Sequence, residues 1–206
     1  TVGRTTLFVT HDQAEGLAIS DRIGVMRQGE LVQLGTPDDI FHRPTDRYVA
    51  EFVGTPPINL FDAELCESSG TRAVRVSGVE MPPGAPLHTP SMDAQWGKLA
   101  RVTLGIRPRY VYLSPADAPE ALPGVVEVVE PTGRETLLHV RLVASAAETS
   151  SFPSQGKVRM GSEGAPDATA RCLVSRADAP PDGAQVALSL RSEHVLLFHP
   201  DTGAAL

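Results

Sequence analysis

The residues best suited to chemistry stand near the start of the chain, in the run Thr10-His11-Asp12-Gln13-Ala14-Glu15. A neutral imidazole can donate one hydrogen bond to a phosphate oxygen or an attacking water and accept another from a neighbour. Asp12, followed three residues later by Glu15, is typical of a helix start, where carboxylates accept from free N–H groups. His11 is therefore a candidate phosphate-binding or water-orienting residue. The simpler alternative is a residue that only caps the helix.

The flanking residues predict the elements that position His11. Residues 6–10 mix β-branched and large apolar side chains, which predicts a short strand buried on both faces of a parallel sheet. The apolar positions of residues 13–20 fall on one face of a helix. His11 would then lie at the carboxyl end of a strand and directly before a helix, where open α/β sheets place their ligand crevice.

The predicted strand needs partners, because an α/β sheet is not built from one parallel strand. Residues 1–4 provide none, so we expect the chain to be the carboxyl-terminal portion of a longer protein. The sequence also contains no G-x-x-x-x-G-K-[ST] loop, the backbone cradle that binds nucleotide phosphates. These residues alone are therefore not expected to form a complete nucleotide site.

A hairpin and a helix are predicted next. Strands over 22–26 and 31–34 would be joined through the tight turn Gln28-Gly29. Thr36-Pro37-Asp38-Asp39 then predicts a helix start, with a hydroxyl cap, a proline at the first position and two acids at the positive end of the dipole.

A second helix is predicted from Thr45, as its cap, to Val53, with Gly54 as its stop. Thr55-Pro56-Pro57 follows, and consecutive prolines force an extended, stiff connection. We therefore expect a domain boundary here, with one domain over 1–54 and another over 55–206.

Beyond this boundary the pattern is all β, and short strands separated by turns predict a barrel. Residues 102–113 and 186–197 share five identities in twelve, which indicates two related halves. Arg107 and Arg191 are equivalent in this repeat and could bind an anion or close each half through salt bridges. The predicted strands cover 60–65, 73–79, 100–106, 124–130, 136–142, 171–174, 186–190 and 195–198. Residues 144–170, rich in Ser, Gly and Pro, are predicted to form a surface loop.

Several motifs in one order resemble the end of an ABC-transporter ATPase domain, closest to the ATP-binding subunits of sugar and glycerol-3-phosphate importers. They are Val9 to Glu15, Ser20-Asp21-Arg22-Ile23, Gly29 to Pro37, His42-Arg43-Pro44 and Phe52-Val53-Gly54. The β region is similar to the OB-like regulatory (TOBE) domain that follows this ATPase domain. Arg109 and Tyr110 depart from the family, which usually has an acid and a His after Arg-Pro. The resemblance implies a mainly β fold, a duplicated OB-like barrel preceded by the α/β tail of a P-loop NTPase domain.

The resemblance also implies the chemistry. His11 would be the switch histidine that contacts the ATP γ-phosphate and orients the attacking water, as the candidate catalytic residue. ATP and Mg²⁺ would be bound only by the full-length protein, so this portion alone would be an inactive part of an ABC-type ATPase. The expected partners are a second ATPase subunit in a homodimer, transmembrane permease subunits and, indirectly, a substrate-binding protein. The expected location is the cytoplasmic face of the cell membrane.

Two other classes of function compete with this one. The β region could be a stand-alone, non-enzymatic OB-like module for binding or interaction. His11-Asp12 could instead belong to a metal-dependent phosphohydrolase, although the other five histidines have no regular spacing. A net charge of −7 argues against a nucleic-acid partner, because phosphate backbones bind to basic surfaces. Cys66 and Cys172 stand far apart in no metal-binding pattern, so two buried reduced thiols are expected, with a disulfide as the alternative.

Overall fold

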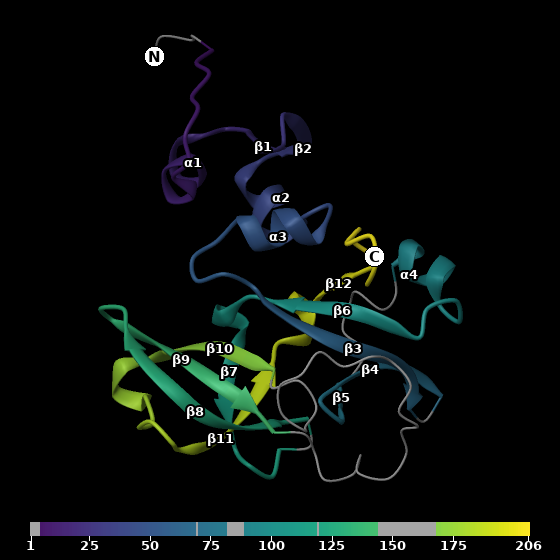
Figure 1. Cartoon of the computed structure of the whole chain (residues 1–206), viewed down its shortest axis with the longest axis vertical. Helices are drawn as coiled ribbons and strands as arrows, with labels where there is room; N and C mark the ends of the chain where they lie inside the picture. The colour runs from purple at the N-terminus through teal and green to yellow at the C-terminus, as the bar shows by residue number, and fades with distance from the viewer. Residues whose placement is uncertain (1–4, 69, 82–88, 119, 144–167) are drawn as a thin grey trace, which may run out of the picture.

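The computed structural model describes residues 5–68, 70–81, 89–118, 120–143 and 168–206, and it divides into a small helical part and a larger β part (Figure 1). The helical part contains three helices and a hairpin. Their bounds are α1 (Gln13–Ile19), β1 (Ile23–Arg27), β2 (Glu30–Gly35), α2 (Pro37–His42) and α3 (Arg47–Phe52).

Local chemistry explains the start of each of these elements. Gln28 and Gly29, with φ of 51° and 87°, form the tight turn that joins β1 to β2. Thr36 and Asp39 form a reciprocal capping box at the start of α2. The prediction of Thr45 as the cap of α3 is wrong by one residue. The side chain of Asp46 accepts from the Val49 N–H, while Thr45 instead donates to the side chain of Gln33.

The strand predicted over residues 6–10 does not form. Leu7 and Val9 are 91% and 88% exposed, and residues 5–10 have no regular secondary structure. An apolar run becomes a buried strand only when other strands flank it, and none of the described strands pairs with this run (Figure 1). The predicted helix after it is present as α1.

The β part consists of two five-stranded antiparallel sheets, in the orders β12-β6-β3-β4-β5 and β10-β9-β8-β11-β7. Five is also the number of strands in an OB-fold. The bounds are β3 (Asn59–Ser68), β4 (Thr71–Val76), β5 (Val79–Met81), β6 (Arg101–Ile106), β7 (Val111–Ser114), β8 (Leu122–Pro131), β9 (Glu135–Leu142), β10 (Thr169–Ser175), β11 (Gln185–Leu190) and β12 (Leu196–Phe198). The mainly β prediction is confirmed.

Some details differ from the predicted elements, and strand β7 is not among the predicted strand ranges. The strand expected over 73–79 is split into β4 and β5, because Ser77 and Gly78 have φ of 47° and 80° and turn the chain. Helix α4 (Pro90–Gln95), with Thr89 as its cap, was not predicted. Of the surface loop predicted over 144–170, residues 144–167 lie outside the described residues. Its last two residues, 169 and 170, belong to β10.

The sequence repeat is also a structural repeat in which strands are exchanged. In the first copy β6 leads through the short 3-10 helix η2 (Pro108–Tyr110) into β7, and in the second β11 leads through η5 (Ser192–His194) into β12. β7 pairs with β11, and β12 pairs with β6. Each copy therefore contributes one strand to each sheet, and neither sheet is completed by one copy alone.

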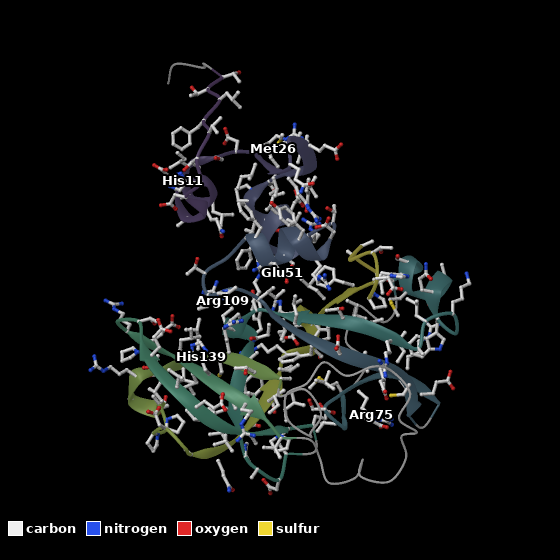
Figure 2. The ribbon with its side chains drawn as sticks, viewed as in Figure 1. His11, Met26, Glu51, Arg75, Arg109 and His139 are labelled. Carbon is white, nitrogen blue, oxygen red and sulfur yellow. The ribbon has the colours of Figure 1, made fainter. Side chains whose placement is uncertain are left out.

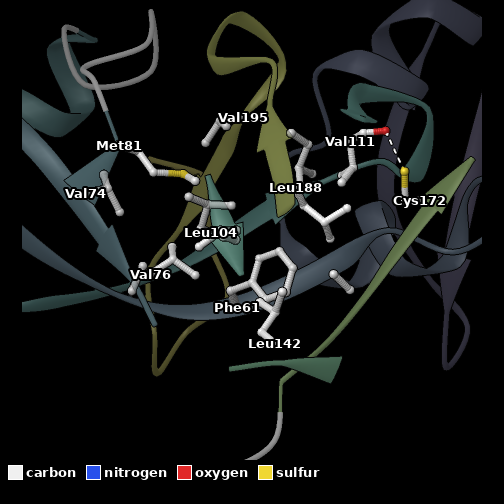
Figure 3. Packing of buried hydrophobic residues seen from close by; sticks show 14 of the residues in the cluster. Phe61, Val74, Val76, Met81, Leu104, Val111, Leu142, Cys172, Leu188 and Val195 are labelled. Carbon is white, nitrogen blue, oxygen red and sulfur yellow. Dashed lines mark hydrogen bonds between the residues drawn. The ribbon is translucent and has the colours of Figure 1, made fainter. Parts of the chain in front are cut away.

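One apolar core fills the space between the sheets, and equivalent residues of the two copies meet in it. Leu104 and Leu188 are buried there, as are Val111 and Val195 (Figure 3). Cys172 lies in the same core and its thiol donates to the carbonyl of Val111 at 3.1 Å (Figure 3). Both cysteines are free, and Cys66 is only half-buried, so the expectation of two buried thiols holds for Cys172 alone.

A buried amide also links the two sheets. Asn59, 1% exposed at the start of β3, donates to the Arg171 carbonyl at 2.8 Å and accepts from the Arg171 N–H at 2.7 Å. Its side chain thus satisfies both backbone groups of a residue in the other sheet.

Replacing Asn59 should therefore destabilise the fold. We expect Asn59→Ala to lower the free energy of unfolding by about 2–4 kcal/mol, because it leaves buried backbone groups without partners. Asp62→Ala, at an exposed position of the same strand, is the matched control and should change it by less than about 0.5 kcal/mol. Equal effects of the two substitutions in denaturant titrations would contradict this role for Asn59.

The thiols should differ in reactivity. Burial raises the pKa of Cys172 to about 12, so almost no thiolate forms there at pH 8. Burial also raises the pKa of Cys66, but its side chain is partly accessible. We expect iodoacetamide to label Cys66 in the folded protein and Cys172 only after unfolding, as mass spectrometry can measure. Labelling of Cys172 first would contradict this.

Candidate functional site

His11 lies on the surface, in a turn that its neighbours hold in shape. The hydroxyl of Thr10 donates to a carboxylate oxygen of Glu15 at 3.1 Å and accepts from the Asp12 N–H at 2.9 Å. The carboxylate of Asp12 accepts from the Glu15 N–H at 3.1 Å, so Asp12 is the helix cap that the sequence predicts. These bonds fix the backbone on both sides of His11 and leave its imidazole exposed to solvent (Figure 2).

Helix α1 is joined to the end of the helical part by one side chain. The Gln13 side-chain oxygen accepts from the Gly54 N–H at 2.8 Å, across 41 residues of sequence. Gly54 has φ of 114°, and a Cβ there would lie 2.6 Å from Nη1 of Arg107. Both the backbone conformation and the space therefore require glycine at this position.

The guanidinium that lies so close to Gly54 is nearly buried. Arg107, 4% exposed, donates through Nε and Nη2 to the Phe41 carbonyl at 3.2 and 2.7 Å, and through Nη1 to the Val53 carbonyl at 2.6 Å. The Cζ atom of Arg107 also lies 3.8 Å from the centre of the Phe41 ring. Phe41 and Val53 lie at the carboxyl ends of α2 and α3, where carbonyls lack intrahelical partners and the helix dipole is negative.

Arg107 therefore caps two helices of the other part of the molecule. Burial lowers the pKa of Arg107 to about 10, which leaves the guanidinium charged at neutral pH. The expectations of a salt bridge or a free anion site are wrong for this residue, because its donors already serve backbone carbonyls. Its counterpart Arg191 is exposed to solvent.

Two further contacts join the helical and β parts. The hydroxyl of Tyr110, on η2, lies 3.3 Å from Nε2 of His42. Nδ1 of the same imidazole lies 2.9 Å from Oδ1 of Asp38. The Tyr110 ring stacks on His194, the equivalent residue of the second copy, with centroids 3.7 Å apart. Thus η2 of the first copy, supported by η5 of the second, faces α2.

The end of the chain makes the other contact. The Arg47 N–H donates to the Gly203 carbonyl at 2.8 Å, and the Ala205 N–H donates to the Thr45 carbonyl at 3.0 Å. Ala50 of α3 is buried in a small apolar cluster with Ile58 and Phe198. The division into domains 1–54 and 55–206 stays a prediction. If it is correct, the contacts of Arg107, of Tyr110 and of the end of the chain form the interface between the two domains.

Grouped metal ligands and membrane-spanning helices are both absent from the described residues. Within the described ranges, no three His, Cys, Asp or Glu side chains are grouped so that they could hold a metal ion. No helix of this described part is long and apolar enough to cross a membrane. Among the described residues, His11 thus belongs to no cluster of metal ligands.

Sequence reasoning proposed His11 as a candidate but did not predict the contacts that surround it. The Gly54 N–H and the carbonyls of Phe41 and Val53 are backbone groups, and no residue type marks which side chain they will meet. The repeat drew attention to Arg107, since it is one of five identities between the copies. The repeat could not show that only the arginine of the first copy would meet the carboxyl ends of α2 and α3.

Comparison with known proteins indicates the class of protein to which this chain is similar. Residues 104–166 match the TOBE domain family, within the β part that Arg107 connects to the helices. Together with the curated relatives, this match shows that the chain is similar to the C-terminal region of the ATP-binding subunits of ABC importers.

Three relatives illustrate the match. The xylose/arabinose import ATP-binding protein XacK of Haloferax volcanii is 34% identical over 206 residues, 100% of this chain and 46% of XacK. The sn-glycerol-3-phosphate import ATP-binding protein UgpC of Vibrio cholerae is 33% identical over 147 residues, 71% of this chain and 36% of UgpC. The maltose/maltodextrin import ATP-binding protein MalK of Salmonella typhimurium is 38% identical over 146 residues, 69% of this chain and 37% of MalK. The chain thus spans less than half the length of these relatives.

Among solved structures, the cytoplasmic molybdate-binding protein ModG, with molybdate bound, is similar to part of this chain. The match covers 69% of this chain and 96% of that one, with a TM-score of 0.42 and 14% identity. We infer no ligand from so distant a likeness.

Removing the Arg107 guanidinium should weaken the junction strongly. We expect Arg107→Met to lower the free energy of unfolding by about 3 kcal/mol or more, because three hydrogen bonds from a charged group are lost and two carbonyls remain buried. Arg107→Lys should restore only part of this, since an ammonium cannot reproduce the planar fork.

The repeat provides a matched control for this substitution. Arg191→Met changes the equivalent but exposed residue and should alter stability by less than about 0.5 kcal/mol. Similar losses for Arg107→Met and Arg191→Met in denaturant titrations would contradict the capping role of Arg107.

Proposed function

We propose that this chain is the C-terminal part of the ATP-hydrolysing subunit that powers an ABC importer, for sugars or glycerol-3-phosphate. The observation that carries the proposal is the similarity to XacK over all 206 residues, because it includes both the His11 turn and the TOBE domain. The names of UgpC and MalK support the same substrate class.

In this function His11 is the switch histidine. Its exposed imidazole can donate one hydrogen bond to the γ-phosphate or to the attacking water while the surrounding turn holds its backbone in place. Phosphoryl transfer depends mainly on positioning and charge stabilisation, so one well-placed donor affects the rate strongly. ATP and Mg²⁺ would be held by residues outside this chain, since its sequence has no phosphate loop.

The exposed apolar surface of the helical part supports a larger ATPase domain. Leu7, Phe8 and Val9 precede α1, and each is at least half exposed. On the hairpin, Met26, Leu31 and Leu34 are similarly exposed. These two groups of apolar side chains are what a parallel sheet and its covering helices would bury in a complete domain.

The remaining parts of the proposal concern partners and place. The TOBE domain would serve regulation and dimerisation, because paired ATPase subunits need an interface that persists when their nucleotide sites open. Two such subunits would act with transmembrane permease subunits, and through them with a substrate-binding protein. The subunit would lie on the cytoplasmic face of the membrane.

The test is His11→Ala in the complete subunit, assembled with its membrane partners. Nucleotide binding should stay within a few-fold, while ATP hydrolysis and uptake fall by about 10²-fold or more, because a preorganised donor to developing phosphoryl charge is lost. His139→Ala, on β9 and far from His11, is the control and should hydrolyse ATP at the normal rate (Figure 2).

Two results would contradict the proposal. Hydrolysis that survives nearly unchanged in His11→Ala would make His11 only a helix-start residue. A gene that encodes no ATPase domain upstream of these residues would instead favour the stand-alone OB-like module, whose ligand binding would not depend on His11 at all.

A further inference from the structure

Helix α1, which follows His11, has little packing of its own. None of its residues is buried. The side chain of Leu17 is partly buried and packs against the small core around Val25, Ile40 and Val49. In Figure 1 the helix stands at the edge of the helical part, next to residues 5–10. Contacts of this kind leave the orientation of a helix weakly specified, so a directional bond to a fixed partner has a large effect.

The hydrogen bond from Gly54 to Gln13 is such a bond, and its donor is held firmly. The Val53 carbonyl, directly before Gly54, accepts from Nη1 of Arg107 at 2.6 Å. The same nitrogen leaves no room for a Cβ on Gly54. The position of the Gly54 N–H is therefore set by the guanidinium that extends from the β part.

We propose that Gln13 is a positioning residue for His11, and that it links the orientation of His11 to the TOBE domain through Gly54, Val53 and Arg107. The proposal rests on the proposed function. Each step is a hydrogen bond or a covalent neighbour. The path runs from Arg107 to the Val53 carbonyl, from the Gly54 N–H to the Gln13 oxygen, and along two residues of backbone to His11. Movement of the β part that displaces Arg107 would thus displace the turn that holds His11.

The chemistry of the bond gives a selective pair of substitutions. Within the described part of the chain, the Gln13 side chain uses its oxygen alone, as an acceptor. Gln13→Glu keeps an acceptor oxygen at the same reach, and its charge lies at the favourable N-terminal end of α1. Gln13→Met keeps a similar length and shape but has no comparable acceptor.

The first measurement follows the bond itself and needs no ATP hydrolysis. In the folded protein, Gln13→Met should speed hydrogen exchange of the Gly54 amide about tenfold or more, while Gln13→Glu should preserve its protection. Unchanged exchange in Gln13→Met would show that the link does not hold α1, and this would overturn the proposal whatever the function of the protein.

The second measurement concerns catalysis in the complete, membrane-assembled subunit. Gln13→Met should lower kcat for ATP about tenfold or more with KM within about twofold, because a misplaced donor slows the chemical step without weakening binding. Gln13→Glu should restore most of the rate. In the His11→Ala background, Gln13→Met should have no further effect, since it acts through His11.

The outcomes separate the two proposals. If His11→Ala is inactive but Gln13→Met has normal kcat, His11 is catalytic and the positioning role of Gln13 is overturned. If Gln13→Met and His11→Ala reduce kcat by independent factors, Gln13 does not act through His11 and the proposal also fails. If His11→Ala hydrolyses ATP normally, the switch assignment fails, and with it any positioning of a catalytic histidine.

Discussion

The junction between the two parts depends on one guanidinium. Arg107 extends from the β part and satisfies carbonyls at the carboxyl ends of α2 and α3, which would otherwise be buried without partners. The helices are six residues each, too short to be stable by their own hydrogen bonds. Their order comes instead from caps at both ends, the side chains of Thr36 and Asp46 at the start and Arg107 at the finish.

An arginine stands at the same position in both copies of the internal repeat, but the two copies use it differently. Both copies have the same turn, in which the N–H of Tyr110 or His194 donates to the carbonyl of the arginine three residues earlier. The rings of Tyr110 and His194 then stack between the copies. The backbone geometry is thus shared, while only the arginine of the first copy faces the carboxyl ends of α2 and α3. Arg107 is buried for that reason and Arg191 is not.

The sequence could predict what depends on near neighbours. The capping box at Thr36, the turn at Gln28-Gly29 and most strands of the β part follow from patterns a few residues long. The same logic failed for residues 6–10, because the burial of an apolar run depends on strands elsewhere. His11 was proposed from its local pattern and stays a prediction. Its link through Gln13 to Gly54 spans 41 residues and that of Arg107 to Phe41 spans 66, and both end on backbone groups that sequence does not mark.

A buried charge also constrains how the molecule can move. Burial disfavours the charged form of Arg107, yet with a pKa of about 10 it remains charged at pH 7 and keeps its full set of donors. If the helical part swung away from the β part at this point, the guanidinium and two carbonyls would lose their partners together. Such a loss is far more costly than breaking an exposed ion pair. The helical part and the first copy of the β repeat should therefore move as one body, so that motion of the β part reaches the junction next to α1.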